Sequence, residues 1–442
     1  MIQTTAQFFT RVMHRWLPDA FLFALILTFV VLIAGVLAEQ RTPHQMAVYW
    51  GGGVWDLLTF SMQVLLTLVT GHVVAQAPLI KRTLRAIAQL ASTPAQAIML
   101  MTFVAMLCCW LNWGFGLIAS ALFAREIART VAGVHYPLLV ASAYSGMLIW
   151  HAGLSGSIPL KIAEEGNDSV AAVMAGNIIP VSETIFSWPV LVIVSFLLLT
   201  LPLLNRFMLP APEASSEIDP KQLLEPEKNV PTVGSMSPAE KMEHHALIPL
   251  LLVLLGGYYL VTEFSNGGSI GLNTINLMLL LLGLILHKTP FNYLRAMDEA
   301  IRGTSGIVLQ FPLYAGIMGM MVQSGLAASI SEWFVSVSTV ETFPLLTFLS
   351  AGIVNFFVPS GGGQWAVQGP IVMPAAEALG VPLNKAAMAV AFGDAWTNMV
   401  QPFWALPLLG IAGLGIKDIM GYCTVALVWS GIVICLGMLI LF

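Results

Sequence analysis

The hydrophobic pattern of the chain is a series of long apolar runs separated by short polar stretches. Runs of about 20 residues are what α-helices need to cross the hydrocarbon core of a bilayer. They fall at 19–38, 54–76, 96–123, 137–160, 186–208, 246–263, 270–287, 303–325, 343–378, 386–409 and 417–441. The first run exceeds the apolar core of a signal peptide, so we expect it to remain as a spanning helix. The pattern predicts an all-α polytopic membrane protein.

Two of the runs are too long for one straight crossing, and each is interrupted at its centre. Residues 94–124 contain "NWGFG", and residues 343–378 contain "NFFVPSGGGQW". Each glycine in a helix costs about 1 kcal/mol relative to alanine, and a proline removes a backbone hydrogen bond. Irregular backbone at membrane depth is tolerated only where it is buried in protein or lines a cavity. We therefore predict two re-entrant helical hairpins.

The basic residues are consistent with this topology, because cytoplasmic loops carry an excess of Lys and Arg. With the N-terminus in the cytoplasm, the cluster at 81–85 is cytoplasmic after two crossings. A hairpin at 96–123 returns Arg125 and Arg129 to the same side, whereas a single crossing would not. The acidic turn at 164–168 then lies outside. This gives nine crossings and two hairpins of opposite orientation.

An internal repeat supports the opposition of the hairpins. "RTP" at 41–43 recurs 247 residues later as "KTP" at 288–290 (288 − 41 = 247). Other matches follow in the same order: Gln63 and Gln76 with Gln310 and Gln323, Asn112 with Asn355, and 141–160 with 389–408. Inverted repeats with broken helices that meet near the bilayer midplane are typical of secondary transporters.

A polar segment rich in Pro, Glu and Ser separates the two repeats. We predict a first transmembrane repeat at 1–209 and a polar cytoplasmic linker at 210–245. An extra helix and the second, inverted repeat follow at 246–442. The extra helix is what places the two repeats in opposite orientations.

Composition and charge exclude several other classes of protein. The chain is 57% hydrophobic and 9% charged, where soluble domains carry about 25% charged residues. Its net charge of −5 includes no basic stripe that would indicate nucleic acid. The four cysteines have neither metal-ligand spacing nor a disulfide pattern. There is no HExxH motif, nucleotide-binding loop or Ser-His-Asp arrangement, so we expect no enzyme activity and no cofactor.

The two hairpin tips are the first candidates for a binding site. Their freed amides and helix N-termini can hold an anion, and their freed carbonyls can hold a cation. The candidate substrate-binding residues there are Asn112, Trp113, Gly114, Gly116, Asn355, Ser360, Gly361, Gly362, Gly363, Gln364 and Trp365. The alternative for the first tip is a helix kink packed by small residues.

The broken spans after each hairpin are the second group of candidates. "GDAWTNMVQPFW" places Asp394, Thr397, Asn398 and Gln401 at spacings that share one helical face. We assign Thr397, Asn398 and Gln401 to substrate binding. An ionised Asp at a helix centre costs about 2.5–3.5 kcal/mol, so Asp394 faces a cavity, a cation or a proton path, or is protonated. "SGMLIWHAGLSGS" adds Ser155 and His151, which with Asp394 are the candidates for binding the coupling ion or proton. His151 is either a proton carrier or a hydrogen-bonded packing residue.

At these same motifs the chain resembles the short-chain fatty acid transporter family of bacterial inner membranes. The strings that carry the resemblance include "NWGFG", "FAREIAR", "NTINLM", "VPSGGGQW", "QPFWALP" and "IAGLG". The resemblance implies uptake of short-chain monocarboxylates such as butyrate or acetoacetate. More distantly, the chain looks like the superfamily of divalent-anion/sodium symporters, which implies anion and Na⁺ sites at Asn112, Asn355 and Ser360. The tips lack the Ser-Asn-Thr triplets of that branch, which argues against sodium coupling and against recognition of dicarboxylates.

Taken together, the residues and the resemblance predict a secondary active transporter that imports short-chain fatty acids by alternating access. Coupling to H⁺ or Na⁺ would offset the opposition of the membrane potential to an anion. The aromatic residues Phe115, Trp396 and Trp404, with Trp113 and Trp365, could enclose a short apolar tail. The alternatives are a dicarboxylate/sodium symporter and an anion channel. An elevator motion would favour a homodimer, by analogy alone.

Overall fold

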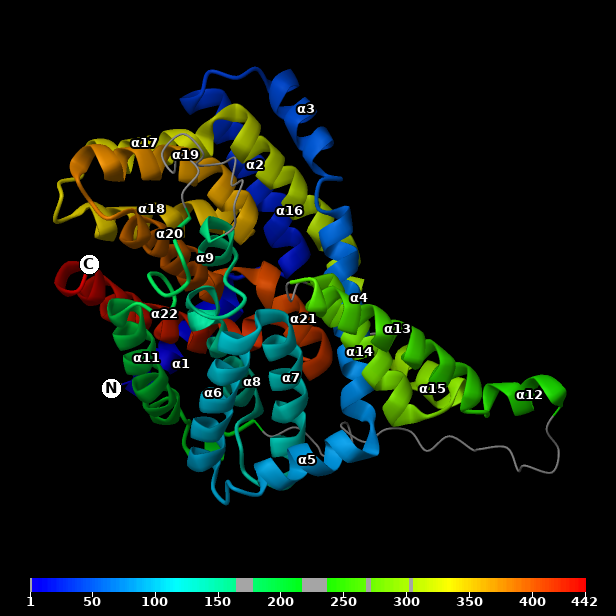
Figure 1. The fold of residues 1–442 in the computed structure, drawn as a ribbon. Helices are drawn as coiled ribbons and strands as arrows, with labels where there is room; N and C mark the ends of the chain where they lie inside the picture. Colours follow the sequence, from blue (N-terminus) through cyan, green and yellow to red (C-terminus); the bar gives the residue numbers. More distant parts are fainter. Residues whose placement is uncertain (1, 164–177, 217–236, 268–271, 302–304) are drawn as a thin grey trace.

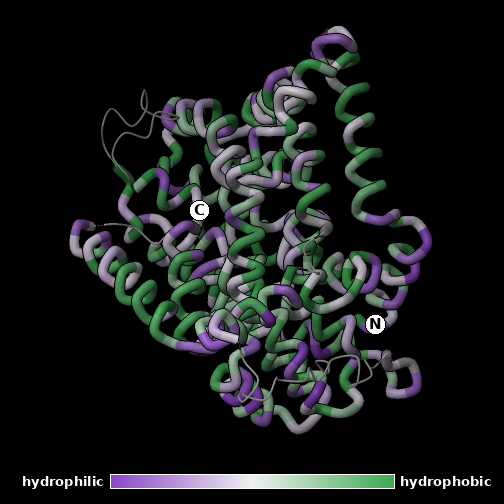
Figure 2. Tube along the Cα trace, turned by 90° about the vertical axis from the view of Figure 1, so that its right-hand side faces the viewer, coloured by the Kyte–Doolittle hydropathy of each residue, from purple (hydrophilic) through white to green (hydrophobic). Residues whose placement is uncertain are grey.

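The structure is a computed structural model that describes residues 2–163, 178–216, 237–267, 272–301 and 305–442. The predicted acidic turn at 164–168 and most of the polar linker lie outside these ranges. Every regular element in the described ranges is a helix. Figure 2 shows hydrophobic residues along the long helices and hydrophilic residues gathered mainly toward their ends.

Long apolar helices dominate the architecture. Within the described ranges, six helical stretches are long and apolar enough to cross a membrane, and three bent helix pairs raise the number to nine. The six are α2 (Ala20–Ala38), α6 (Pro94–Leu111), Tyr136–Ile162, α11 (Trp188–Phe207), Pro238–Ser265 and α22 (Ile416–Ile440). The bent pairs begin at α4 (Leu58–Gln76), α14 (Leu272–His287) and α16 (Ser305–Ser324). A polytopic membrane protein is therefore confirmed.

The helices of the two halves follow one another in the same order. In the first half α2 is followed by α3 (Pro43–Gly53), α4, α5 (Pro78–Ala88), α6, α7 (Trp113–Thr130), α8 (Tyr136–Tyr144), α9 (Ser157–Ile162) and α11. Their counterparts are α14, α15 (Pro290–Ile301), α16, α17 (Leu326–Ser336), α18 (Phe343–Phe357), α19 (Gly361–Leu379), α20 (Leu383–Thr397), α21 (Pro402–Ala412) and α22. The repeat read from short sequence matches therefore extends over whole elements.

The packing of the two halves is reciprocal. Helix α4 packs on α14 while α16 packs on α2, and α7 packs on α21 while α19 packs on α9. When two halves are related by a two-fold axis, each contact between two helices is repeated by their two counterparts. Figure 1 shows α5 at the bottom of the molecule and α17 at the top, so the counterparts lie at opposite ends. The inverted repeat is confirmed.

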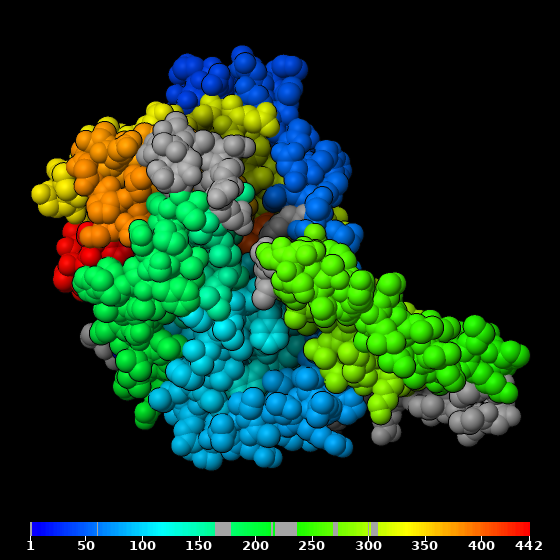
Figure 3. Space-filling view, viewed as in Figure 1, coloured from blue at the N-terminus to red at the C-terminus, as the bar shows by residue number. Residues whose placement is uncertain are grey.

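The helices form two groups. We call one the frame: it contains α2, α3, α4, α13 (Leu247–Ser265), α14, α15 and α16, which pack on one another. A Cβ at Gly53 of α3 would lie 2.8 Å from the Cα of Gly319 in α16, so these two helices approach closely. Figure 3 shows α12 (Pro238–Glu243) to α15 projecting from one side of the body. We call the other the hairpin group: α6 to α9, α11 and α18 to α22.

Both predicted hairpins are present. One residue, Asn112, separates α6 from α7, and a Cβ at Gly116 would lie 2.5 Å from the backbone nitrogen of Cys109 on the other arm. Although α6 is long enough to cross a membrane, the chain therefore folds back on it. In the second hairpin, Gln364 of α19 donates through Nε2 to the carbonyl of Ala351 in α18 at 2.8 Å. The turn between these arms is at 358–360.

The spans that follow the hairpins are broken, as predicted. Helix α8 continues as a 3₁₀ helix, η1 (Ser145–Ala152), and stops before α9. Helix α20 ends at Thr397, and a short 3₁₀ turn, η7 (Asn398–Val400), leads to α21. The prediction that Gln401 shares one continuous helical face with Asp394 is wrong, because Gln401 is extended with φ −100° and ψ 128°. The next residue is Pro402, and a proline disfavours the helical conformation in the residue before it.

Candidate functional site

The second hairpin is fixed to the second broken helix through the carboxamide of Asn355. This side chain is fully buried. Its Nδ2 lies 2.7 Å from the carbonyl oxygen of Asp394, 3.0 Å from Thr397 Oγ1 and 2.8 Å from Asn398 Oδ1. Thr397 in turn donates to the carbonyl of Gly352 in α18 at 2.8 Å. The polar residues of the break therefore face the hairpin and not the lipid.

Several polar atoms around this carboxamide have no hydrogen-bond partner within the described residues, although they are buried. They are Asn355 Oδ1, Asp394 Oδ2, Asn398 Nδ2 and Gln401 Oε1. A buried polar atom left unpaired costs about 1–3 kcal/mol. A cluster of them around one residue indicates a place where water, an ion or a ligand binds.

His151 and Asp394 form a buried hydrogen bond that joins the two repeats. His151 Nδ1 lies 3.2 Å from Asp394 Oδ1, and both side chains are buried, at 0% and 1% exposure. The backbone N–H of Ile158 donates to His151 Nε2 at 3.0 Å. Because Nε2 accepts a hydrogen bond, the imidazole proton is on Nδ1 and is donated to the carboxylate. The histidine predicted as either a proton carrier or a packing residue is thus both oriented and paired.

The N-terminus of α19 lies against this pair. A Cβ at Gly361 would be 2.8 Å from His151 Cε1 and 3.2 Å from Ser157 Cβ. Ser360 caps the helix, accepting the backbone N–H of Gly363 at 3.2 Å. By contrast, a Cβ at Gly362 would have no atom within 4 Å. A helix N-terminus carries about half a positive charge, which suits an anion.

The first hairpin tip is organised differently. Asn112 accepts the backbone N–H of Phe115 at 3.0 Å and thereby caps α7. The backbone N–H of Trp113 donates to Ser155 Oγ at 3.0 Å. Gly114 is buried, whereas Phe115 is 42% exposed and does not line an enclosed space. The structure gives Ser155 a positioning role at this tip.

An aromatic cluster connects the first tip to both broken helices. The ring of Trp113 is edge-on to Trp404 of α21 at 4.9 Å and to Trp150 of η1 at 6.1 Å. Trp150 stacks on the imidazole of His151 at 4.1 Å. The four interrupted elements are therefore joined by a continuous series of contacts, which runs from Trp404 and Trp113 through Trp150 and His151 to Gly361. Asn112 bonds to Phe115, whereas Asn355 bonds to residues of the second broken helix.

Two predicted aromatic wall residues have other surroundings. Trp396 donates through Nε1 to the carbonyl of Leu427 at 2.8 Å and so faces α22. Trp365 is buried within the second hairpin. Gln364 Nε2 also bonds to Gln368 Oε1 at 2.7 Å, which ties the amide into the arm of the hairpin.

Sequence reasoning missed two residues of the site. Trp150 was passed over although it directly precedes His151 in the broken span. Tyr144 is buried, and its hydroxyl donates to the carbonyl of Asn398 at 2.6 Å, which links the first broken helix to the second. A phenol in an otherwise apolar helix needs a partner for its hydroxyl, and that requirement could have indicated Tyr144.

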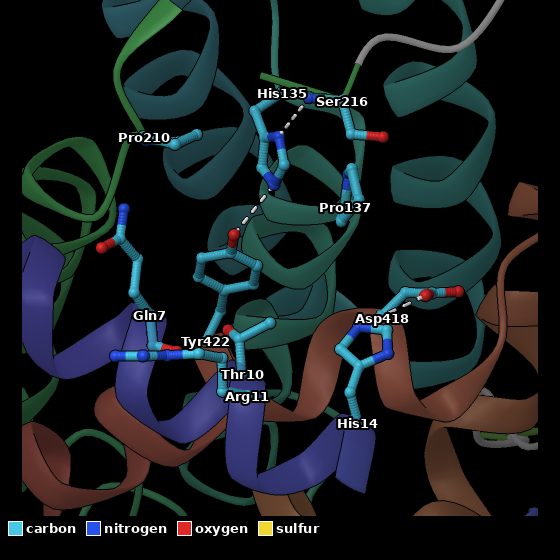
Figure 4. A pocket seen from close by; sticks show the side chains of 10 residues that line it. All are labelled: Gln7, Thr10, Arg11, His14, His135, Pro137, Pro210, Ser216, Asp418 and Tyr422. Carbon is cyan, nitrogen blue, oxygen red and sulfur yellow. Dashed lines mark hydrogen bonds and ion pairs between the residues drawn. The ribbon is translucent and has the colours of Figure 1, made fainter. Parts of the chain in front are cut away.

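A separate cavity of about 590 Å³ lies at the far end of α8 from His151. It is enclosed by α1 (Ile2–Trp16), the start of α8 and the start of α22, as Figure 4 shows. His135 Nε2 lies 2.8 Å from the hydroxyl of Tyr422, and His135 Nδ1 accepts the backbone N–H of Ser216 at 2.8 Å. Burial lowers the pKa of His135 to about 4. This histidine, at the start of α8, therefore links Ser216 in the first part of the polar linker to Tyr422 of α22.

Comparison with known proteins agrees with the geometry. Residues 1–441 match the family described as Short chain fatty acid transporter. The chain belongs to this family. Two relatives carry the name "Putative short-chain fatty acid transporter": one from Escherichia coli K12, 47% identical over 442 residues, and one from Haemophilus influenzae, 43% identical over 444 residues. In both cases the match covers 99% of each chain.

A solved structure is also similar over nearly the whole chain. It is the crystal structure of the Alcanivorax borkumensis YdaH transporter, at 15% identity and a TM-score of 0.44. The match covers 96% of this chain and 97% of that one. The resemblance read from the sequence motifs is confirmed by the family and its relatives, and the protein is a multi-pass member of a transporter family.

Proposed function

We propose that the protein imports short-chain monocarboxylates, such as butyrate or acetoacetate, across the bacterial inner membrane by alternating access. The observation that carries the proposal is an unused donor beside Asn355: Asn398 Nδ2 is buried without a hydrogen-bond partner within the described residues, and the N-terminus of α19 lies against the His151–Asp394 pair. A small anion needs hydrogen-bond donors and a favourable electrostatic environment. The amides of the break and the helix N-terminus supply both without an arginine.

In this proposal the carboxylate of the substrate lies between Asn355, Asn398 and the first turn of α19. A carboxamide can turn to present either its nitrogen or its oxygen, so Asn398 and Gln401 can adapt to the substrate. Trp113, Trp150 and Trp404 enclose the short apolar tail. Each buried CH₂ contributes about 0.8 kcal/mol, so affinity rises gradually with chain length.

The division of the helices into two groups supports the proposal of alternating access. The hairpin group meets the frame through a limited set of helix pairs, chiefly α7 on α4 and α21 on α16. Movement of the hairpin group against the frame would carry the site from one side of the membrane to the other. With the N-terminus in the cytoplasm, α1 and α5 lie at the inner surface. A co-transported cation, H⁺ or Na⁺, offsets about 2.3 kcal/mol per charge at 100 mV.

Transport is tested with purified protein in proteoliposomes. The measurement is counterflow of labelled butyrate into vesicles preloaded with unlabelled butyrate, minus the signal of protein-free vesicles. We expect saturable, protein-dependent exchange that acetoacetate competes for and succinate does not. Competition by succinate would instead indicate a dicarboxylate transporter, and non-saturable flux would indicate a channel. Absence of protein-dependent exchange would refute the proposal.

A further inference from the structure

We propose that Asp394 carries the coupling proton of the transport cycle, and that one proton accompanies each monocarboxylate. This inference rests on the proposed function and specifies its coupling ion. His151 acts as a positioning residue that holds the carboxyl group in place. The net charge moved in each cycle is then zero.

The first argument is the position of the carboxyl group. Asp394 belongs to the second repeat and His151 to the first, so their contact crosses the junction of the two halves. The backbone carbonyl of Asp394 accepts the Asn355 amide, which is the central contact of the proposed substrate site. A proton bound to this carboxyl group would therefore change the electrostatic potential at the substrate's own carboxylate.

The second argument identifies the atom that takes the proton. His151 already uses both ring nitrogens: Nδ1 donates to Asp394 Oδ1, and Nε2 accepts the backbone N–H of Ile158. A second proton on the ring would bind to Nε2. The resulting Nε2–H would repel the Ile158 N–H and break the hydrogen bond between them. Asp394 Oδ2 is buried and has no hydrogen-bond partner within the described residues. The proton therefore binds at Oδ2, and the imidazole stays neutral.

The third argument is the charge around Asp394. In the described ranges the side-chain partner of its carboxylate is the neutral imidazole of His151. The helices packed on α20 carry other titratable groups, but Lys161 of α9 and Glu377 of α19 are exposed, and α18 has none. On the remaining packed elements, η7 has none, and α22 has Lys417, Asp418, Tyr422, Cys423 and Cys435. Lys385 of α20 itself bonds to the carbonyl of Phe442, so no lysine or arginine within the described residues is paired with Asp394.

These facts give the coupling a physical cause. An ionised Asp394 and a bound carboxylate would place two negative charges together in a site of low dielectric constant. When two carboxylates lie close together, their repulsion strongly favours protonation of one of them. The empty site with ionised Asp394 and the loaded site with protonated Asp394 and one carboxylate both carry a single negative charge. Only these two forms of the protein change readily between the inward-facing and outward-facing states. One proton from solution therefore moves with each substrate anion.

The stoichiometry can be measured on the wild-type protein. In proteoliposomes we expect butyrate uptake to follow an inward pH gradient with one proton per butyrate. It should be indifferent to a potential set by K⁺ and valinomycin, and to replacement of Na⁺ by choline. Protein-free vesicles are subtracted, because undissociated butyric acid crosses lipid unaided. Uptake driven by Na⁺, or altered by the membrane potential, would overturn the inference.

Variants assign the proton to its site. Exchange by the wild type should fall as the pH rises, and D394N should have a flat pH profile. D394E should restore a sloping profile. H151A removes the donor that positions the Asp394 carboxylate and should move the pH profile of exchange to higher pH. The exposed Asp56 is the matched control, and D56N should keep the wild-type profile.

The outcomes separate this inference from the proposed function. A D394N profile that matches the wild type would overturn the role of Asp394, even if transport is otherwise normal. Wild-type butyrate exchange that does not depend on pH would overturn proton coupling while leaving the proposed function intact. If D394N does not fold, the stoichiometry measured on the wild type still decides the coupling.

Discussion

Gly361, the first residue of α19, lies directly against the imidazole of His151, so that a Cβ there would be 2.8 Å from His151 Cε1. Separations under 3.0 Å are shorter than real Cβ contacts allow, and this ring is held by Asp394 and by Ile158. The second glycine of the helix, Gly362, is surrounded by open space. The two residues therefore form a matched pair for testing how closely the tip must approach the break.

We expect G361A to lower butyrate exchange at least about tenfold, because the tip must move away from His151. G362A should leave exchange near the wild-type rate. Both changes favour the helix by about 1 kcal/mol, so neither should reduce thermal stability through propensity. Counterflow in proteoliposomes and melting in detergent measure the two quantities. Equal exchange rates in the two variants would contradict the arrangement.

Asn112 caps α7, and that role can be separated from a role in substrate binding. An aspartate at this position keeps an acceptor for the Phe115 N–H and suits the positive end of the helix. N112D should therefore melt at the wild-type temperature and keep butyrate exchange, because the proposed carboxylate site at Asn355, Asn398 and the first turn of α19 does not include this residue. N112A should lose the cap, at a cost of about 1 kcal/mol. Loss of exchange in N112D with unchanged melting would contradict this and place Asn112 at the substrate.

The contact between Trp113 and Trp404 should set the length of the substrate tail. Replacing Trp404 with leucine removes one wall of the proposed tail site. We expect W404L to shift preference toward longer acids, raising the ratio of hexanoate to butyrate exchange several-fold. Each buried CH₂ contributes about 0.8 kcal/mol, which corresponds to about a fourfold change in affinity. Trp429 hydrogen-bonds Thr200, so W429F is a control that should keep the wild-type ratio.

His135 should make the protein less stable in acid. Its pKa is about 4 in the folded protein and about 6.5 when unfolded, so only the unfolded chain binds a proton between these values. Stability is complete above pH 6.5 and falls as the pH is lowered toward 4. In H135Q this part of the pH dependence should disappear, while His14, Asp418 and Tyr422 of the same cavity are unchanged. Melting temperatures at pH 7.5, 6 and 5 in detergent test this, and equal slopes would refute it.

Much of the fold could be predicted, because each break in an apolar run is visible in the chain itself. Asn112, and the stretch from Pro359 to Gly363, interrupt runs that lipid would otherwise favour as unbroken helices. The repeat could also be found, since a few polar residues recur at one offset. The direction of the Gln401 side chain could not be predicted. The spacing argument assumed a regular helix from Asp394 onward, and the residue before Pro402 is extended.

The pairing of His151 with Asp394 was beyond the sequence, although both residues were singled out. They are 243 positions apart, and nothing in either local stretch specifies the other as its partner. The stacking of Trp150 on His151, and the bond from Tyr144 to Asn398, were missed for the same reason.

The sequence by itself determined that the chain resides in a bilayer and where its helices are interrupted. The reason is that lipid offers no partner for a backbone group, so every interruption requires its own polar and glycine residues. Only the tertiary structure decided which interruptions face one another and which atoms remain unpaired. Apolar helices of similar composition can pack in many ways, and the choice among them depends on the shapes of surfaces distant in the chain.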